Sequence, residues 1–232
     1  MPCSVQFSKY GDIDVVRVVD VPALSPDAEQ VRIAVRAAGI NPIDWKTVQG
    51  LMREEFTLTL PAGLGTDVAG VVDQVGADVT EFRAGDAVMG ASLTPSFAEF
   101  AIADPASMIK KPAAINWEVA GSVAGAGGTA YAVLNKLGVH ATDTLLIHAA
   151  AGGVGTFAVQ LAVARGARVI GTARSPISIT CVRWALNRWP TATGFASASA
   201  RSLRGGSTPS STHRAAVKSR CRSPSPEDPN EY

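Results

Sequence analysis

The chain has 232 residues, of which 47% are hydrophobic and 18% are charged, with 21 lysines and arginines against 20 aspartates and glutamates. That apolar fraction excludes a wholly disordered or collagen-like protein, and a total of three cysteines excludes a disulfide scaffold. The charge is unevenly distributed, because residues 1–176 carry 13 basic and 17 acidic side chains, whereas residues 177–232 carry 8 and 3.

The cysteines and the N-terminal residues indicate where in the cell the protein is expected to be located. Cys3, Cys181 and Cys221 lie too far apart for a zinc-binding C-x-x-C pair, so the reducing cytoplasm is the expected location. The first residues lack a basic region followed by an apolar core, which argues against a secretory signal. Residues 144–164 carry no Asp, Glu, Lys or Arg, but glycines interrupt them, and they predict a strand, a turn and a buried helix rather than a membrane span.

Short strands dominate the N-terminal part of the chain. Residues 4–36 and 66–102 contain period-two apolar runs separated by Gly, Asp and Pro. Val68–Val75 and Phe82–Val88 predict two strands joined by a turn. We therefore expect a β-rich domain over residues 1–118, with a small barrel as one arrangement.

The pattern changes at Asn116, where helical spacing begins and continues to Leu134. A short buried strand at Leu145–Ile147, a helix over Val154–Arg165 and a second buried strand at Val169–Thr172 follow. The order strand, helix, strand predicts a βαβ unit with a right-handed crossover over residues 119–176. Such a unit is half of a nucleotide-binding sheet.

The periodicity stops after Ser175, and residues 177–232 are rich in Ser, Arg, Thr, Pro and Ala. This composition predicts a disordered basic tail, because too little apolar surface is present to offset the entropy of ordering. The basic side chains have no aromatic platform or base-reading helix beside them, so we expect no nucleic-acid partner.

The motif that carries chemistry is the turn between the first predicted strand and the helix. Its residues match the dinucleotide-binding spacing G-x-G-x-x-G with Ala150 in the first position. Gly152 would let the backbone approach a pyrophosphate, Gly155 would let the helix pack closely on the strand, and the helix N-terminus would offer free N–H groups to the anion. The alternative is a tight turn with no ligand. The candidate cofactor-binding residues here are Ala150, Gly152, Gly153, Val154 and Gly155.

The residues at the end of the second predicted strand indicate which nicotinamide cofactor, NAD or NADP, the chain would bind. NAD-binding chains place a carboxylate there for the ribose 2′-hydroxyl, and this chain has Thr172-Ala173-Arg174 instead. Arg174 is a fixed cation suited to a 2′-phosphate, which favours NADP, with Thr172 beside it. The alternative is a solvated arginine after a strand.

Six further segments, together with the fingerprint, carry a resemblance to a known family. They are Gly39-Ile40-Asn41-Pro42-Ile43-Asp44-Trp45-Lys46, Gly65-Thr66-Asp67-Val68-Ala69-Gly70-Val71-Val72, Phe82-Arg83-Ala84-Gly85-Asp86-Ala87-Val88, Ser96-Phe97-Ala98-Glu99-Phe100, Lys110-Lys111-Pro112 and Gly127-Gly128-Thr129-Ala130-Tyr131. Over about residues 5–175, the chain is similar to the zinc-free quinone oxidoreductase and enone reductase branch of the medium-chain dehydrogenase/reductase superfamily. The resemblance implies an α/β protein with a GroES-like catalytic domain followed by a Rossmann domain, here incomplete.

The resemblance also indicates whether the chain would bind a catalytic zinc ion. Zinc-dependent relatives carry a Cys ligand where this chain has Asn41 and Gly-His-Glu where it has Gly65-Thr66-Asp67, and their four-cysteine lobe has no counterpart in this sequence. Without those ligands we expect no catalytic zinc. The implied reaction is metal-free hydride transfer from NADPH to a quinone or an α,β-unsaturated carbonyl, in which the protein positions the cofactor.

The resemblance assigns roles to four catalytic candidates. Asn41 and Thr129 would lie near the nicotinamide, and Asp44 would help to hold the loop that carries Asn41. An amide N–H, a hydroxyl or Lys46 could stabilise the negative charge that forms on the substrate oxygen, although an exposed structural lysine is the alternative for Lys46. Tyr131 is expected to be a core residue rather than a proton donor.

The chain departs from the family after the second strand, where relatives continue with further Rossmann strands. One reading is a natural extension. The other is a one-nucleotide frameshift near Ser175–Ile177, because the shifted codons of residues 183–187 permit Leu-Gly-Ala-Glu and those of residues 205–213 permit Gly-Val-Asp-Ala-Val-Leu-Asp-Thr. The strand that relatives often use to form homodimers would then be missing.

A truncated sheet has consequences for stability and activity. Leu145–Ile147 and Val169-Ile170 should be exposed on at least one side, which predicts poor stability or reliance on a partner chain. Cofactor affinity should fall as well. The rival hypothesis is therefore a non-catalytic pseudoenzyme without stable cofactor binding.

Overall fold

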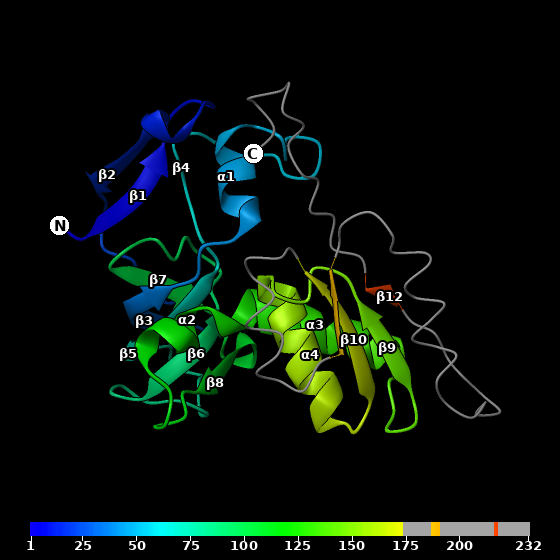
Figure 1. Cartoon of the computed structure of the whole chain (residues 1–232). Helices are drawn as coiled ribbons and strands as arrows, with labels where there is room; N and C mark the ends of the chain where they lie inside the picture. Colours follow the sequence, from blue (N-terminus) through cyan, green and yellow to red (C-terminus); the bar gives the residue numbers. More distant parts are fainter. Residues whose placement is uncertain (174–186, 191–215, 218–232) are drawn as a thin grey trace. The chain divides into compact units, whose positions relative to one another are not determined.

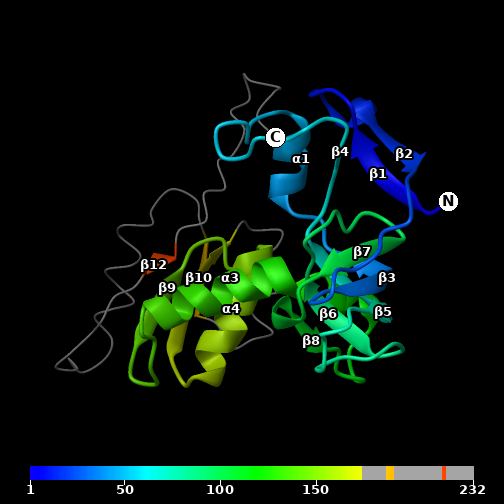
Figure 2. The same cartoon turned by 180° about the vertical axis from the view of Figure 1, so that it is seen from behind.

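The computed structural model describes residues 1–173, 187–190 and 216–217 (Figures 1 and 2). The chain separates into two compact units, Met1–Gly125 (unit 1) and Ala126–Tyr232 (unit 2), and each has its own buried core. The domain boundary predicted after residue 118 lies inside unit 1.

Unit 1 contains a small antiparallel sheet at its N-terminus, with strand order β2-β1-β4. Its core is formed by Phe7, Ala62 and Leu64 together with Val48 from helix α1. In Figure 1, β1 and β2 lie side by side in dark blue. The elements are β1 (Cys3–Phe7), the 3-10 helix η1 (Ile13–Val15), β2 (Val16–Asp20), α1 (Pro42–Val48) and β4 (Ala62–Gly63).

A five-stranded antiparallel sheet forms the larger part of unit 1, with strand order β7-β3-β5-β6-β8. Apolar residues at alternate positions, among them Val31 and Ile33 of β3 and Val68 and Val72 of β5, face one core. The predicted β-rich domain is confirmed. The elements are β3 (Val31–Ala38), β5 (Asp67–Val75), β6 (Ala87–Ala91), β7 (Phe100–Ala103), the 3-10 helix η2 (Pro105–Ser107) and β8 (Met108–Lys110).

The strand predicted at Phe82–Val88 lies further along the chain than expected, because β6 begins only at Ala87 and continues to Ala91. A turn precedes it, in which Asp86 N–H donates to the carbonyl oxygen of Arg83 at 3.1 Å. Gly85 adopts a positive φ of 94° in this turn, a conformation that favours glycine.

The helical spacing from Asn116 to Leu134 gives two helices, α2 (Trp117–Gly121) and α3 (Val123–Lys136). The break lies at Ser122, whose N–H and Oγ both donate to the carbonyl oxygen of Val119. A serine that bonds to its own preceding turn in this way competes with helix continuation.

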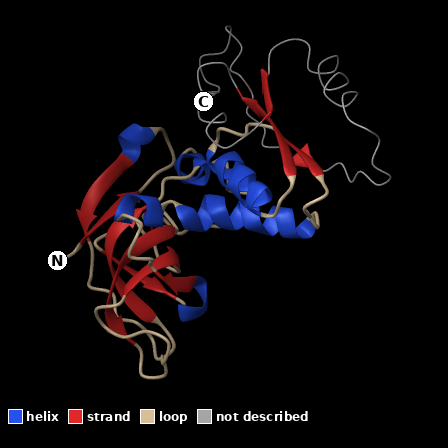
Figure 3. Cartoon of the chain, turned by 60° about the horizontal axis from the view of Figure 1, so that its bottom comes forward, coloured by secondary structure: helices blue, strands red, loops and turns tan. Residues whose placement is uncertain are grey.

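Unit 2 contains the predicted βαβ unit (Figure 3). Strands β9 (Thr144–Ile147) and β10 (Arg168–Ala173) are parallel, and α4 (Gly153–Ala164) connects them. Two short strands extend the sheet, β11 (Asn187–Pro190) beside β10 and β12 (Ala216–Val217) beside β9. The rest of the tail that was predicted to be disordered lies outside the described residues.

Most apolar side chains of this sheet are buried, whereas Leu146 is half-buried. Leu145, Ile147, Val169 and Ile170 are each 9% exposed or less, so the expectation that they lie exposed is wrong. All but Ile170 belong to one core cluster with apolar residues of α3 and α4, because α4 returns over the strands that it connects. Within the residues that the structure describes, no helix is long and apolar enough to cross a membrane.

Candidate active site

The loop before α1 is fixed by a pair of backbone and side-chain bonds. Asn41 N–H donates to Asp44 Oδ2 at 2.6 Å, and Asp44 N–H donates to the carbonyl oxygen of Asn41 at 2.9 Å. Pro42 occupies the first turn of α1, where its fixed φ suits the helix and its missing N–H costs nothing. Asp44 therefore holds the backbone of Asn41 at the start of the helix.

A second carboxylate holds the side chain of Asn41. Asp67 is the first residue of β5, and its Oδ2 accepts from Asn41 Nδ2 and from Gly125 N–H, each at 3.0 Å. Asp67 lies in the matching segment Gly65–Val72, but the sequence alone predicts no functional role for it. The signal in the sequence is a carboxylate at the start of an otherwise apolar run, Asp67-Val68-Ala69-Gly70-Val71-Val72.

Asp44 differs electrostatically from an ordinary surface carboxyl. Burial raises the pKa of Asp44, and the nearby negative charge of Asp67 raises it further, whereas hydrogen bonds from the backbone N–H groups of Asn41 and Gly65 lower it. The net direction is upward because desolvation is the largest of these causes.

The other two catalytic candidates lie in different places. Lys46 is half-buried in α1, with its Nζ 5.6 Å from the centre of the Trp45 ring, and no hydrogen bond joins it to Asn41 or Asp44 in the described structure. Thr129 is an exposed residue of α3 in unit 2.

The glycine-rich turn follows β9 directly, and its shape explains why alanine is accepted at the first fingerprint position. Ala149 has a positive φ of 53°, and its carbonyl oxygen accepts from Gly152 N–H at 2.9 Å. Ala150 is fully buried and donates its N–H to the carbonyl oxygen of Thr172 at 2.9 Å. The left-handed conformation therefore falls on Ala149 and places no demand on Ala150.

The glycines of the turn differ in what surrounds them. A Cβ on Gly155 would lie 2.2 Å from the carbonyl oxygen of Ala149, so the packing of α4 on the turn requires glycine there. The nearest atom to a Cβ on Gly152 would be the same oxygen at 3.3 Å, and on Gly153 the Cβ of Ala126 at 3.7 Å. Packing within the chain therefore demands glycine less strictly at Gly152 and Gly153 than at Gly155.

The first turn of α4 is suited to an anion. The N–H groups of Gly153, Val154 and Gly155 have no hydrogen-bond acceptor among the described residues, and no acidic side chain lies in this turn. Free N–H groups and the positive end of the helix dipole attract phosphate oxygens. The residues present therefore fit the pyrophosphate of a dinucleotide.

Thr172 lies beneath this turn, fully buried in β10. Its Oγ1 is 3.0 Å from Nδ1 of His148, the residue that follows β9. Thr172 thus contacts the turn through its backbone and through His148, while Arg174 lies outside the described residues.

Tyr131 is not the core residue that was expected. It is 56% exposed, and the guanidinium carbon of Arg165 lies 5.7 Å from the centre of its ring. The helix α3 buries Ala130 and Leu134 instead, and Tyr131 lies at the margin of this buried face.

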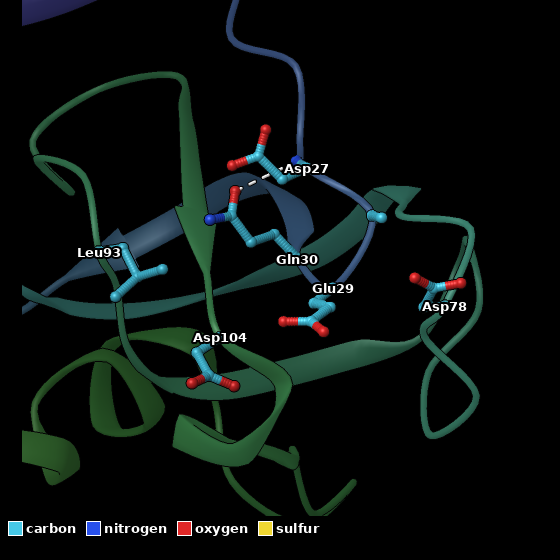
Figure 4. A pocket seen from close by; sticks show the side chains of 7 residues that line it. Asp27, Glu29, Gln30, Asp78, Leu93 and Asp104 are labelled. Atoms are coloured by element: carbon cyan, nitrogen blue, oxygen red, sulfur yellow. Dashed lines mark hydrogen bonds between the residues drawn. The ribbon is translucent and has the colours of Figure 1, made fainter.

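A separate pocket of about 350 Å³ lies in unit 1 (Figure 4). The N–H of Asp27 donates to Gln30 Oε1 at 3.1 Å at its edge. None of the predicted site residues lines this pocket, and the described residues hold no group of three or more His, Cys, Asp or Glu arranged to bind a metal. Its lining is Asp27, Ala28, Glu29, Gln30, Asp78, Leu93 and Asp104.

Comparisons with known proteins agree with this arrangement. Residues 27–113 match the alcohol dehydrogenase GroES-like domain. A quinone oxidoreductase from Pseudomonas aeruginosa is 37% identical over 174 residues, which are 74% of this chain and 53% of that protein. The crystal structure of Escherichia coli quinone oxidoreductase complexed with NADPH superposes with a TM-score of 0.73 at 32% identity, covering 80% of this chain and 57% of that one.

The chain is similar in sequence and fold to quinone oxidoreductases of the medium-chain dehydrogenase/reductase superfamily. The CurK enoyl reductase also superposes, with a TM-score of 0.83 at 28% identity, covering 88% of this chain and 64% of that one. The predicted GroES-like and Rossmann fold of a medium-chain dehydrogenase/reductase is confirmed. The chain spans about half the length of the curated relatives that it matches.

Proposed function

We propose that this protein is an NADPH-dependent, zinc-independent oxidoreductase that transfers a hydride to a quinone or an α,β-unsaturated carbonyl compound. The observation that carries the proposal is the turn after β9, where the first N–H groups of α4 have no acceptor in the described structure and an added Cβ on Gly152 or Gly153 would meet no atom closer than 3.3 Å. A quinone oxidoreductase and an enoyl reductase among the similar proteins support the two substrate classes.

The cofactor would be held by residues of unit 2. The N–H groups of Gly153, Val154 and Gly155 would bind the pyrophosphate, and Gly152 would allow its close approach. Ala150 and Thr172 would shape the turn from below. Arg174 would bind the 2′-phosphate, which is the basis for NADP rather than NAD. NADPH, when bound, supplies the hydride.

The remaining candidates would act on the nicotinamide and the substrate. Asn41 and Thr129 would orient the ring, and Asp44 keeps the backbone of Asn41 in place. Lys46 or an amide N–H would stabilise negative charge on the substrate oxygen. The predicted cytoplasmic location is part of this proposal, which also assigns no metal.

The test is to titrate the full chain with NADPH, follow the cofactor fluorescence, and then measure NADPH oxidation with a simple quinone and a simple enone. We expect saturable binding, turnover with one of these substrates and weaker binding of NADH. The matched variant Arg174→Ala should weaken NADPH binding about tenfold and leave NADH binding unchanged, because only NADPH carries the 2′-phosphate.

The second candidate is the rival hypothesis of the sequence analysis, a non-catalytic relative without stable cofactor binding. A folded protein that neither binds NADPH nor oxidises it would establish this alternative. Binding without turnover of either substrate would retain the cofactor site and reject the reaction.

A further inference from the structure

One buried carboxylate is not explained by the proposed site. Asp67 is 2% exposed, and no basic side chain forms an ion pair with it in the part of the chain that the structure describes. Its negative charge is instead satisfied by N–H donors of Asn41 and Gly125. A carboxylate placed in the interior with two donors on one oxygen is costly to bury, which points to a specific task.

The chemistry of the pair fixes one orientation of the Asn41 side chain. An ionised carboxylate only accepts hydrogen bonds, whereas a carboxamide has a donating end and an accepting end. Asn41 must therefore turn Nδ2 toward Asp67. If the carboxamide were flipped, Asn41 Oδ1 would face an oxygen of the Asp67 carboxylate. Both atoms are acceptors, so no hydrogen bond could form between them.

Close packing keeps the carboxylate in this position. A Cβ on Gly125 would lie 2.8 Å from Asp67 Oδ2, and a Cβ on Gly39 would lie 2.9 Å from Asp67 Cβ, so both backbones approach as only glycine can. Gly125 belongs to the first turn of α3, and its N–H is one of the helix-terminal donors that need an acceptor.

We propose that Asp67 is a positioning residue that sets the orientation of the Asn41 carboxamide and thereby the contact of Asn41 with the nicotinamide. Asn41 is then held by two carboxylates, its backbone by Asp44 and its side chain by Asp67. The nicotinamide contact rests on the proposed function, whereas the orientation of the carboxamide does not.

The orientation is tested without cofactor. Solvent exchange of the Asn41 side-chain NH₂ protons is measured by ¹H–¹⁵N NMR on the full chain, with the signals assigned by their loss in Asn41→Ala. We expect one proton to exchange at least about tenfold more slowly than in an exposed asparagine, because it is bonded to a buried charge. Exchange as fast as in an exposed asparagine in the unaltered protein would overturn the proposal.

Substitutions of Asp67 distinguish an effect on the orientation of Asn41 from a general loss of folding. Asp67→Ala should release the Asn41 proton, whereas Asp67→Asn should keep it protected, since an amide oxygen still accepts from Nδ2. Asp73→Asn is the matched control, because Asp73 lies in the same strand and pairs with Arg32 instead. Protection that survives Asp67→Ala in the folded protein would contradict the proposal.

The link to the cofactor is tested by a double-mutant cycle on the NADPH dissociation constant. Asn41→Ala and Asp67→Ala should each weaken binding about tenfold, and the double variant should be no weaker than Asn41→Ala within about threefold. Fully multiplicative losses would show that Asp67 does not act through Asn41. If the unaltered protein does not bind NADPH, the proposed function fails, and the exchange measurement still decides the orientation.

Discussion

Gly152 and Gly155 lie in the same turn, yet the structure gives them different reasons to be glycine. Gly155 is required by the carbonyl oxygen of Ala149, which would lie 2.2 Å from an added Cβ. Gly152 has an extended backbone with φ −79°, and the nearest atom to an added Cβ would be 3.3 Å away, so a side chain there requires only a small shift of its neighbour.

This difference predicts opposite phenotypes. Gly155→Ala should lower the free energy of unfolding by about 1–3 kcal/mol, because the backbone must shift to relieve the overlap. Gly152→Ala should change it by less than about 1 kcal/mol and weaken NADPH binding instead. Urea unfolding and a cofactor titration on both variants check this; equal losses of stability would contradict it.

The buried carboxyl of Asp44 predicts a pH dependence with a defined sign. Because burial raises its pKa in the folded state, folding favours the protonated form, and this contribution is greatest below the ordinary range of an aspartate and is lost as the pH rises through the folded-state pKa. Relative to Asp44→Asn, the unaltered protein should therefore lose stability between acid and neutral pH.

The measurement is urea unfolding of both proteins across that pH range, compared as a difference so that other titrating groups cancel. The asparagine keeps an oxygen that can accept from Asn41 N–H, which limits the structural change. A difference that moves in the other direction with pH would show that the hydrogen bonds to Asp44 outweigh its burial.

At the scale of elements, the turn between β5 and β6 holds an aspartate, Asp86, whose pKa is lowered in the folded protein, in contrast to that of Asp44. Asp86 accepts from Arg83 N–H at 3.2 Å and forms an ion pair with Lys110 of β8 at 3.2 Å. The hydrogen bond from the Arg83 backbone is the largest of the causes that lower the pKa of Asp86. Its carboxylate form therefore stabilises the turn, chiefly through the hydrogen bond from Arg83.

We expect Asp86→Asn to reduce stability at neutral pH and to have little effect once the pH falls below the folded-state pKa of Asp86. The stabilisation is present above the ordinary aspartate range and disappears as the carboxyl is protonated. Thermal unfolding of the variant and the unaltered protein at neutral and acid pH tests this, and a deficit that persists in acid would reject it.

The sequence pattern predicted some elements correctly and missed other features. Periodicity was sufficient for β9 and α4, because each buries one face at a regular spacing, and a continuous apolar run was sufficient for β5 and β10, which bury consecutive residues. Periodicity failed at Ser122, where a local side-chain bond ends α2 inside a continuous helical pattern. It failed for Asp67 too, since the donors that satisfy this carboxylate come from residues 26 and 58 positions away. Such pairings depend on tertiary packing and leave no local pattern.

At the scale of the whole molecule, the two units have separate cores. Leu134 is fully buried in the core of unit 2, while Ile33 is fully buried in that of unit 1. Leu134→Ala should cost about 2–5 kcal/mol in the unit that contains it. Hydrogen exchange followed by mass spectrometry should then accelerate in β9 and β10 and not in β3 and β5.

Ile33→Ala is the matched control and should produce the reverse pattern. Equal acceleration in both units from either substitution would show that the chain unfolds as one cooperative body, in spite of its division into two cores.

The open edge of the first sheet affects how the protein behaves at high concentration. Within the described residues, β2 pairs only with β1, and Val18 on this strand is 71% exposed. An unpaired strand with an apolar side chain invites strands from neighbouring molecules to add to it. Val18→Lys should therefore raise the concentration at which light scattering first detects self-association, and leave NADPH binding unchanged. An unchanged onset would show that the edge is already protected.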